Sequence, residues 1–390
     1  MRLLVKTMLG VLLLIALLAL TVMLRPVEAS AVIWPIVESM NLDEYRGITT
    51  DGQVQPGLFP VRATGVSTAP VREAANALLA TLTDAQRADV MFAVTDDEWR
   101  RWANIHISAR RGVGFADMTA AQQDAVWALL AAGLSNKGYA LARDVVRLEE
   151  HLAELMDDHY QYGEHRYWIT MMGEPSATEP WGWQFEGHHL IINYFVLGDQ
   201  VVMTPTFVGS EPIRAVSGKY AGTEILQAEQ ELGLALMNAL PEPQRMAATV
   251  ALEKPGNNNY AELFSDNVVV PVQGLNLAAV QGDTVALAEQ LIRTYVDNLR
   301  PGHADVLMED IRAHWSATHF AWVGPHDAEA VFYYRIQSPV FMIEFDHQGP
   351  VALAGDGPSR NHIHAVMRTP NGNDYGKSLL AQHLALKHSP

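Results

Sequence analysis

The sequence predicts an α+β fold, with mainly antiparallel sheets, flanking helices and a helical N-terminal part. Helical periodicity dominates residues 70–160, whereas strand patterns first appear at Tyr167. Helices and strands then follow one another in runs instead of alternating strictly, which is typical of α+β proteins. With 390 residues, 49% of them hydrophobic, the chain can bury one large core.

The first 29 residues have the features of a secretory signal peptide. Arg2 and Lys6 precede an apolar run over residues 8–24. The small residues that follow provide a cleavage site after Ala29 or Ala31. The run is long for a signal, so an uncleaved membrane anchor formed by residues 8–24 is the alternative. In both cases we expect an extracytoplasmic protein, periplasmic or secreted, that contacts a membrane only through this segment.

Proline and glycine punctuate residues 30–69, which we expect to form an irregular lead-in. No internal repeat divides the chain after it. We therefore expect a single large domain over residues 70–390, helical over 70–160 and mixed sheet and helix over 161–390.

The helices are predicted from apolar positions at helical spacing and from capping residues. A Thr83 cap divides residues 70–92 into two helices, a capping box at Thr119 opens a helix to residue 134, and Ser135 caps a long helix to about residue 156. The later predicted helices cover residues 223–240, 243–252, 285–299, 304–318 and 373–387.

The strands are predicted from alternating or continuously apolar runs bounded by turn residues. They cover residues 167–172, 183–197, 200–208, 320–323, 330–337, 340–346 and 362–368. The turn at Gly198-Asp199 makes a hairpin of the second and third strands, and Ser338-Pro339 makes another.

Composition excludes several classes of function. The net charge of -17 argues against nucleic acid as a partner, because phosphate binding needs clustered Lys and Arg. The chain has no cysteine, which excludes disulfides, a thiolate nucleophile and Cys-ligated metals. A divalent transition metal such as zinc, copper or iron would have to be held by His, Asp, Glu or backbone oxygen.

The strongest candidate for metal binding is His362-Ile363-His364. Residues i and i+2 of a strand face the same side, so both imidazoles can reach one metal ion. A polar strand face without a ligand is the alternative, because a short H-x-H pattern is common.

Glu344 and Asp346 share a strand face in the same way, on an otherwise apolar strand. A carboxylate is costly to bury there unless it is paired, hydrogen-bonded or bound to a metal. Glu344 is therefore a candidate ligand and Asp346 a candidate general base. A salt bridge to Arg335 across the hairpin is the alternative.

The adjacent His188 and His189 are the third candidate group. On a continuous strand, Glu186 and His188 face one side and His189 the other. A bulge at Gly187 would re-aim one of the two rings. Both histidines are candidate ligands, His188 being favoured, and Glu186 is a candidate general base.

Cationic and phenolic groups are expected to orient a small polar or anionic ligand. Arg335 is one of them, and Arg110-Arg111 offers guanidinium groups for a carboxylate or phosphate. Tyr375 lies beside the N-terminus of the last helix, where anions bind, although helix capping alone would explain its loop.

Aromatic residues near the candidate ligands are expected either to wall a ligand pocket or to pack in the core. They are Trp181, Trp183, Phe185, Trp322, Tyr333 and Tyr334.

Several segments match a known family in order along the chain. They are WQFEGHHL at 183–190, TPTFVG at 204–209, FAW at 320–322, YRI at 334–336, IEFD at 343–346, HIH at 362–364 and GNDYG at 372–376. As a set they resemble the uncharacterised bacterial and fungal family called domain of unknown function 3500 (DUF3500). The resemblance implies one large family domain behind an export signal and no established activity.

The residues themselves favour an exported metal-dependent enzyme, a hydrolase more than an oxidoreductase. His362 and His364 would be ligands, with His188 or Glu344 completing the shell, and a nearby carboxylate would act as base on a metal-bound water. Two alternatives use the same residues: an extracytoplasmic ligand- or metal-binding protein without turnover, and a copper or iron oxidoreductase. The ligand types suit all three.

Overall fold

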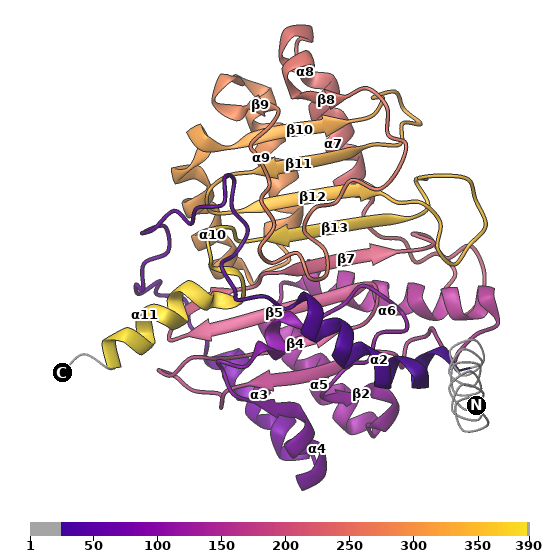
Figure 1. The fold of residues 1–390 in the computed structure, drawn as a ribbon, viewed down its shortest axis with the longest axis vertical. Coiled ribbons are helices and arrows are strands. Elements are labelled where there is room, and N and C mark those ends of the chain that lie inside the picture. The colour runs from indigo at the N-terminus through magenta and orange to yellow at the C-terminus, as the bar shows by residue number, and fades with distance from the viewer. Residues whose placement is uncertain (1–24, 388–390) are drawn as a thin grey trace, which may run out of the picture.

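A 13-stranded, mostly antiparallel sheet runs through the whole computed structural model, which describes residues 25–387 (Figure 1). Its strands follow the order β1-β3-β4-β5-β7-β13-β12-β11-β10-β8, with β2 beside β3, β6 beside β5 and β9 beside β10. Only the β1–β3 and β10–β8 pairs are parallel among the described strands. The predicted α+β class is confirmed.

The helices are α2 (Pro26–Asn41), α3 (Ala69–Thr81), α4 (Asp84–Val90), α5 (Ala120–Gly133), α6 (Asn136–Met156), α7 (Gln227–Ala239), α8 (Glu242–Ala248), α9 (Asp283–Val296), α10 (Pro301–Ala313) and α11 (Lys377–Lys387). The strands are β1 (Met91–Phe92), β2 (Val113–Gly114), β3 (Trp168–Met172), β4 (Trp181–Glu186), β5 (Leu190–Leu197), β6 (Gln200–Val202), β7 (Thr206–Ser210), β8 (Thr249–Ala251), β9 (Leu275–Asn276), β10 (His319–Val323), β11 (Tyr333–Gln337), β12 (Met342–His347) and β13 (Ile363–Arg368).

The helix starts follow from local hydrogen bonds that the sequence encodes. Thr83 and Thr119 each form a full capping box with the Gln three residues later, at the starts of α4 and α5. The Ser135 hydroxyl accepts from the Gly138 N–H at 3.0 Å and opens α6. These side chains satisfy N–H groups that would otherwise lack partners in the first helical turn.

One predicted strand is divided in the structure. Residues 183–197 form two strands, β4 and β5, joined by a tight turn in which the Gly187 N–H donates to the Leu190 carbonyl at 2.8 Å. Glu186 pairs with Ile191 across this hairpin, so the two share a face. A continuous strand would have put Glu186 and Ile191 on opposite faces; the prediction of one strand over residues 183–197 is wrong here, because the turn resets the alternation of side chains.

The lead-in is less irregular than expected, because its first part belongs to α2. Trp34 of this helix packs against Phe264 with ring centroids 6.0 Å apart, and its buried Glu38 pairs with Arg111. The expected signal or anchor segment, residues 8–24, lies outside the described residues. Within residues 25–387, no helix combines the length and apolar character needed to cross a bilayer.

Helices cover one face of the sheet, and this face is apolar. Its side chains include Phe185, Tyr194, Ile343 and Phe345, which pack in a single core with α3, α5, α6, α7, α9 and α10. Most of the aromatic residues considered as pocket walls lie in this core. They are Trp181, Trp183, Phe185, Trp322 and Tyr334.

The other face of the sheet is unusually polar although it is buried. Cross-strand pairing places Tyr333, Asp346, His364 and Gly209 in one row across it. Irregular segments, α2 and α11 cover this face on the near side of Figure 1. Loops have unpaired backbone N–H and C=O groups, so they can satisfy buried polar side chains that an apolar helix face cannot.

A buried ion network shows how this face is stabilised far from the histidines. The Arg368 guanidinium contacts Asp374 at 2.8 Å and Asp266 at 2.6 Å, and Asp266 also contacts Arg100 at 2.8 Å. The Tyr375 hydroxyl donates to Asp266 at 2.8 Å. The network fixes the chain reversal before α11.

Replacing Arg368 by Leu should destabilise the protein by about 3–5 kcal/mol, because the buried Asp374 loses its cation and Asp266 keeps only Arg100. The matched control is Arg312→Leu, which removes an exposed pair with Glu289 and should cost at most about 1 kcal/mol. Urea denaturation of both variants measures the difference. Equal losses of unfolding free energy in the two variants would contradict a stabilising role for the buried network.

Candidate metal centre

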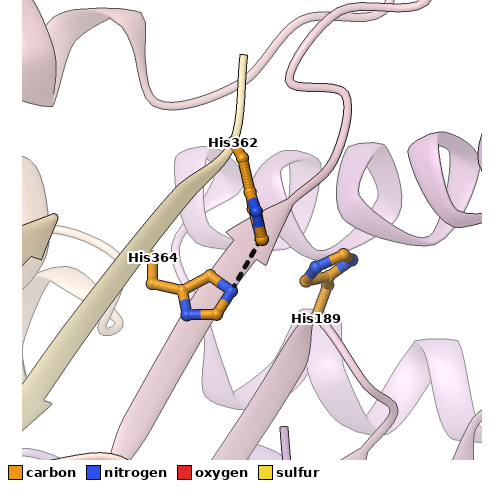
Figure 2. Close-up of side chains that lie close together, drawn as sticks. All are labelled: His189, His362 and His364. Atoms are coloured by element: carbon orange, nitrogen blue, oxygen red, sulfur yellow. Dashed lines mark hydrogen bonds between the residues drawn. The ribbon is translucent and has the colours of Figure 1, made fainter. Parts of the chain in front are cut away.

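Three histidines from two separate parts of the chain meet at one end of the polar face. His189 lies in the turn before β5, His362 immediately precedes β13, and His364 is on β13. Each offers a ring nitrogen, and these three atoms lie within 4.8 Å of one another (Figure 2). All three side chains are buried.

Each of these rings is anchored through its Nδ1 atom. His189 Nδ1 lies 3.0 Å from Glu149 Oε2, His362 Nδ1 lies 2.7 Å from the Gly349 carbonyl, and His364 Nδ1 lies 2.7 Å from Glu262 Oε1. Metal-binding histidines nearly always have such an acceptor on the second ring nitrogen, because it fixes the tautomer and the orientation of the ring.

The electrostatics keep the acceptors charged. Burial by itself would raise the pKa of Glu149, but contacts with His188 and His189 outweigh burial and hold it below its ordinary value. Burial by itself would also raise the pKa of Glu262. Contacts with His364, Asn259 and Asn104 outweigh burial and lower this pKa to about 2. Both carboxylates are therefore ionised at neutral pH and accept hydrogen bonds.

The electrostatics also keep two of the histidines neutral. Burial and the neighbouring His188 lower the pKa of His189 to about 3. Burial and His364 hold the pKa of His362 well below its ordinary value. A neutral imidazole has one N–H and one lone pair, and only the lone pair binds a metal.

The contact between His362 and His364 is the most informative one in the site. Their Nε2 atoms lie 3.0 Å apart, while each Nδ1 faces a group that can only accept a hydrogen bond. If both rings are neutral, both Nε2 atoms present lone pairs to each other. That arrangement is unfavourable unless a cation, either a proton or a metal ion, lies between them.

The 3.0 Å spacing of the His362 and His364 Nε2 atoms is close to that of two ligands of one metal ion. Two nitrogens at about 2.0–2.1 Å from a tetrahedral zinc ion lie roughly 3.3 Å apart. Gly209 keeps space beside the rings: a Cβ atom there would lie 2.9 Å from His364 Cδ2 and 3.1 Å from His189 Cδ2. Any larger residue at 209 would therefore displace the rings.

His188 lies beside the three histidines and is anchored by the same carboxylate. Its Nδ1 is 2.8 Å from Glu149 Oε1, and its ring centroid is 3.5 Å from that of His189. The side chain is 12% exposed, compared with 3% for His189. His188 was the favoured ligand from the sequence, but the turn brings His189 to the other two rings and leaves His188 on the solvent side.

Asp346 and Glu344 lie on the same face but have protein partners. Asp346, next to His364 in the sheet register, contacts Lys254 Nζ at 2.7 Å and the Asn258 N–H at 2.7 Å. Glu344 accepts from the Tyr333 hydroxyl at 2.6 Å and from the N–H groups of residues 260 and 261. Burial raises the pKa of both carboxyls, to about 6 for Asp346 and about 7 for Glu344.

Glu186 is not part of the histidine cluster. It is fully buried at the end of β4, and its nearest cation is Arg110, whose Nε lies 3.7 Å from Glu186 Oε2 without a hydrogen bond. Burial outweighs the attraction to Arg110 and raises the pKa of Glu186 to about 7.

The expected ligand-orienting groups are occupied elsewhere. Arg335 contacts the Pro271 carbonyl at 3.0 Å, Arg111 pairs with Glu98 and Glu38, and Tyr375 belongs to the ion network of Asp266. No Arg335–Glu344 ion pair within 4.0 Å occurs among the described residues, because the Tyr333 hydroxyl lies between them.

Two carboxylates that anchor the rings, Glu149 and Glu262, were not among the residues predicted from the sequence. Glu149 had a usable signal, since it is an acidic residue beside Leu148 on the buried stripe of α6 that includes Val145 and Leu152. Glu262 had none, because it lies in the long irregular connection between β8 and β9.

Comparison with known proteins places the chain in a family without assigning it a function. A family model described as "Protein of unknown function (DUF3500)" matches residues 64–377, most of the chain. No curated protein and no solved structure matches it.

Replacing Glu186 by Gln should stabilise the protein increasingly as the pH rises. Its folded-state pKa of about 7 lies above the ordinary value of 4.5, so the cost of burying the charge is absent below pH 4.5 and complete above pH 7. The gain over wild type should reach roughly 3 kcal/mol at pH 8. Urea denaturation at pH 4.5 and 8 tests this, with Glu242→Gln at the surface as control; a pH-independent difference would refute it.

Proposed function

The chain belongs to the DUF3500 family, and we propose that it is a metal-dependent hydrolase in which His189, His362 and His364 hold one divalent ion. The proposal rests on the 3.0 Å contact between the Nε2 atoms of His362 and His364. Their Nδ1 atoms are bound to acceptors, so a cation is needed between the two rings. The signal-like N-terminus supports a location outside the cytoplasm.

Zinc is the ion that these residues suit best. The shell has three imidazole nitrogens and no sulfur, and three protein ligands leave a fourth position for water. A divalent ion lowers the pKa of such a water to about 7, which makes hydroxide available at neutral pH. Imidazole also binds copper and iron, so metal identity decides between hydrolysis and redox chemistry.

His188 is well placed to accept the proton that this water loses. Its Nδ1 is held by Glu149, which leaves Nε2 free, and it is more exposed than His189. Water would attack a carbonyl or phosphoryl centre of the substrate while its proton passes to His188 Nε2. The bond between that centre and the leaving group would then break, and His188 would give the proton to the leaving group. In this proposal His188 acts as a general base, whereas the sequence predicted it as a metal ligand.

Protein purified without a polyhistidine tag should contain about one metal ion per chain. His189→Ala, His362→Ala and His364→Ala should each lose it, because two imidazoles are too few for a stable site. His326→Ala, at an exposed histidine, should keep it. Elemental analysis by mass spectrometry gives the stoichiometry. A metal-free wild type whose thermal stability does not change with zinc, copper or manganese would mean that a proton joins His362 and His364.

Metal-loaded protein should hydrolyse members of a panel of esters, amides and phosphoesters. His188→Ala should lower kcat by about 10²–10⁴-fold with the metal retained, since only proton transfer is lost. His326→Ala is again the control. A loaded wild type that hydrolyses nothing in the panel indicates a binding protein, and an electron paramagnetic signal with oxidation of a substrate indicates an oxidoreductase.

A further inference from the structure

Two arginines lie close to the indole of Trp168. The Arg110 guanidinium carbon lies 5.4 Å from the ring centroid and that of Arg166 lies 5.1 Å from it. Burial first, and then the positive charge of Arg110, lower the pKa of Arg166. Two like charges near one indole repel each other, so an anion bound beside Arg166 would be favoured.

Arg166 lacks a carboxylate partner. Among residues 25–387 no acidic side chain lies within 4.0 Å of it, and its buried Nε has no hydrogen-bond acceptor. By contrast, Arg111 contacts Glu98 at 2.7 Å and Glu38 at 2.9 Å. The Arg166 guanidinium therefore has an N–H group without a protein acceptor.

Arg110 contributes a second positive charge near Trp168. Its Nη2 donates to the Ala103 carbonyl at 2.7 Å, which fixes the group, and its buried Nε has no hydrogen-bond partner. The nearest carboxyl, Glu186, is 3.7 Å away and has a pKa of about 7, so it neutralises Arg110 only in part at neutral pH.

This arginine pair is electrostatically linked to the histidine cluster. Glu149, which anchors His188 and His189, acts on the pKa of both arginines. Burial first, then His188 and to a smaller extent Arg110, lower the pKa of His106 to about 4, and the ring centroid of His106 is 5.8 Å from that of His188. Arg166, Trp168, His106 and His188 are each partly exposed, so solvent reaches this side of the cluster.

We propose that Arg166, supported by Arg110 and Trp168, binds an oxyanion group of the substrate, so that the enzyme acts on small molecules carrying a carboxylate or a phosphate. This inference rests on the proposed hydrolase function. The arginines bind the anionic group while the histidine cluster holds the ion, and His188 is the histidine whose ring contacts both His106 and His189. Planar guanidinium donors match the geometry of both oxyanions.

Isothermal titration calorimetry with inorganic phosphate and, separately, with acetate tests the site in anion-free buffer. Arg166→Ala and Arg166→Gln should each weaken the preferred anion by roughly 10- to 100-fold, because a charge-assisted contact is lost. Arg143→Ala is the matched control, since Arg143 also lies over an indole, 4.4 Å from the Trp127 ring, and should bind as wild type does. The anion that binds identifies the substrate group.

The same titration on metal-free His364→Ala protein separates this inference from the proposed function. Anion binding that persists there and still depends on Arg166 supports the arginine site even if no metal is ever found. Binding that disappears with the metal shows that the ion, and not Arg166, holds the anion. Equal affinity of wild type and both Arg166 variants, or no binding of either anion by wild type, overturns the inference.

Discussion

The structure depends on how one buried, polar face of a large sheet is satisfied. A carboxylate or guanidinium that leaves water must find partners of matching charge or hydrogen-bonding capacity. Arg368 does so with Asp374 and Asp266, and Glu344 does so with Tyr333 and two backbone N–H groups. Irregular segments cover this face because their free backbone groups can supply such partners.

At His362 and His364 the protein provides no such solution. Glu262 and the Gly349 carbonyl each face an Nδ1 atom, so the 3.0 Å contact between the Nε2 atoms needs a proton or a metal ion between the rings. Glu149 similarly anchors His189 through Nδ1. The surrounding acceptors thus predispose the cluster to hold a cation, because they hold the N–H groups on Nδ1 and direct the Nε2 atoms toward one another.

Most of the fold could be predicted from the sequence, because helix and strand periods and capping boxes are local. The helix starting after Thr119 and the strand ending at Arg368 are examples. The site could be predicted only in part. His362 and His364 follow from the two-residue period of a strand, whereas the choice between His188 and His189 depends on a turn at Gly187. That glycine is needed because a Cβ there would lie 2.4 Å from the Tyr167 ring, a contact distant in sequence.

The sequence alone determined the α+β class, the pair of histidines at the start of β13 and the exclusion of cysteine chemistry, since each depends on composition or on neighbouring residues. The tertiary structure decided which distant groups meet. Glu149 anchors His189 from 40 positions away, and Glu262 anchors His364 from 102. It also decided that Arg111 pairs with two carboxylates, whereas Arg166 has no carboxylate within 4.0 Å among the described residues. Such pairings depend on how helices and loops pack on the sheet, and no local pattern of side chains specifies that packing.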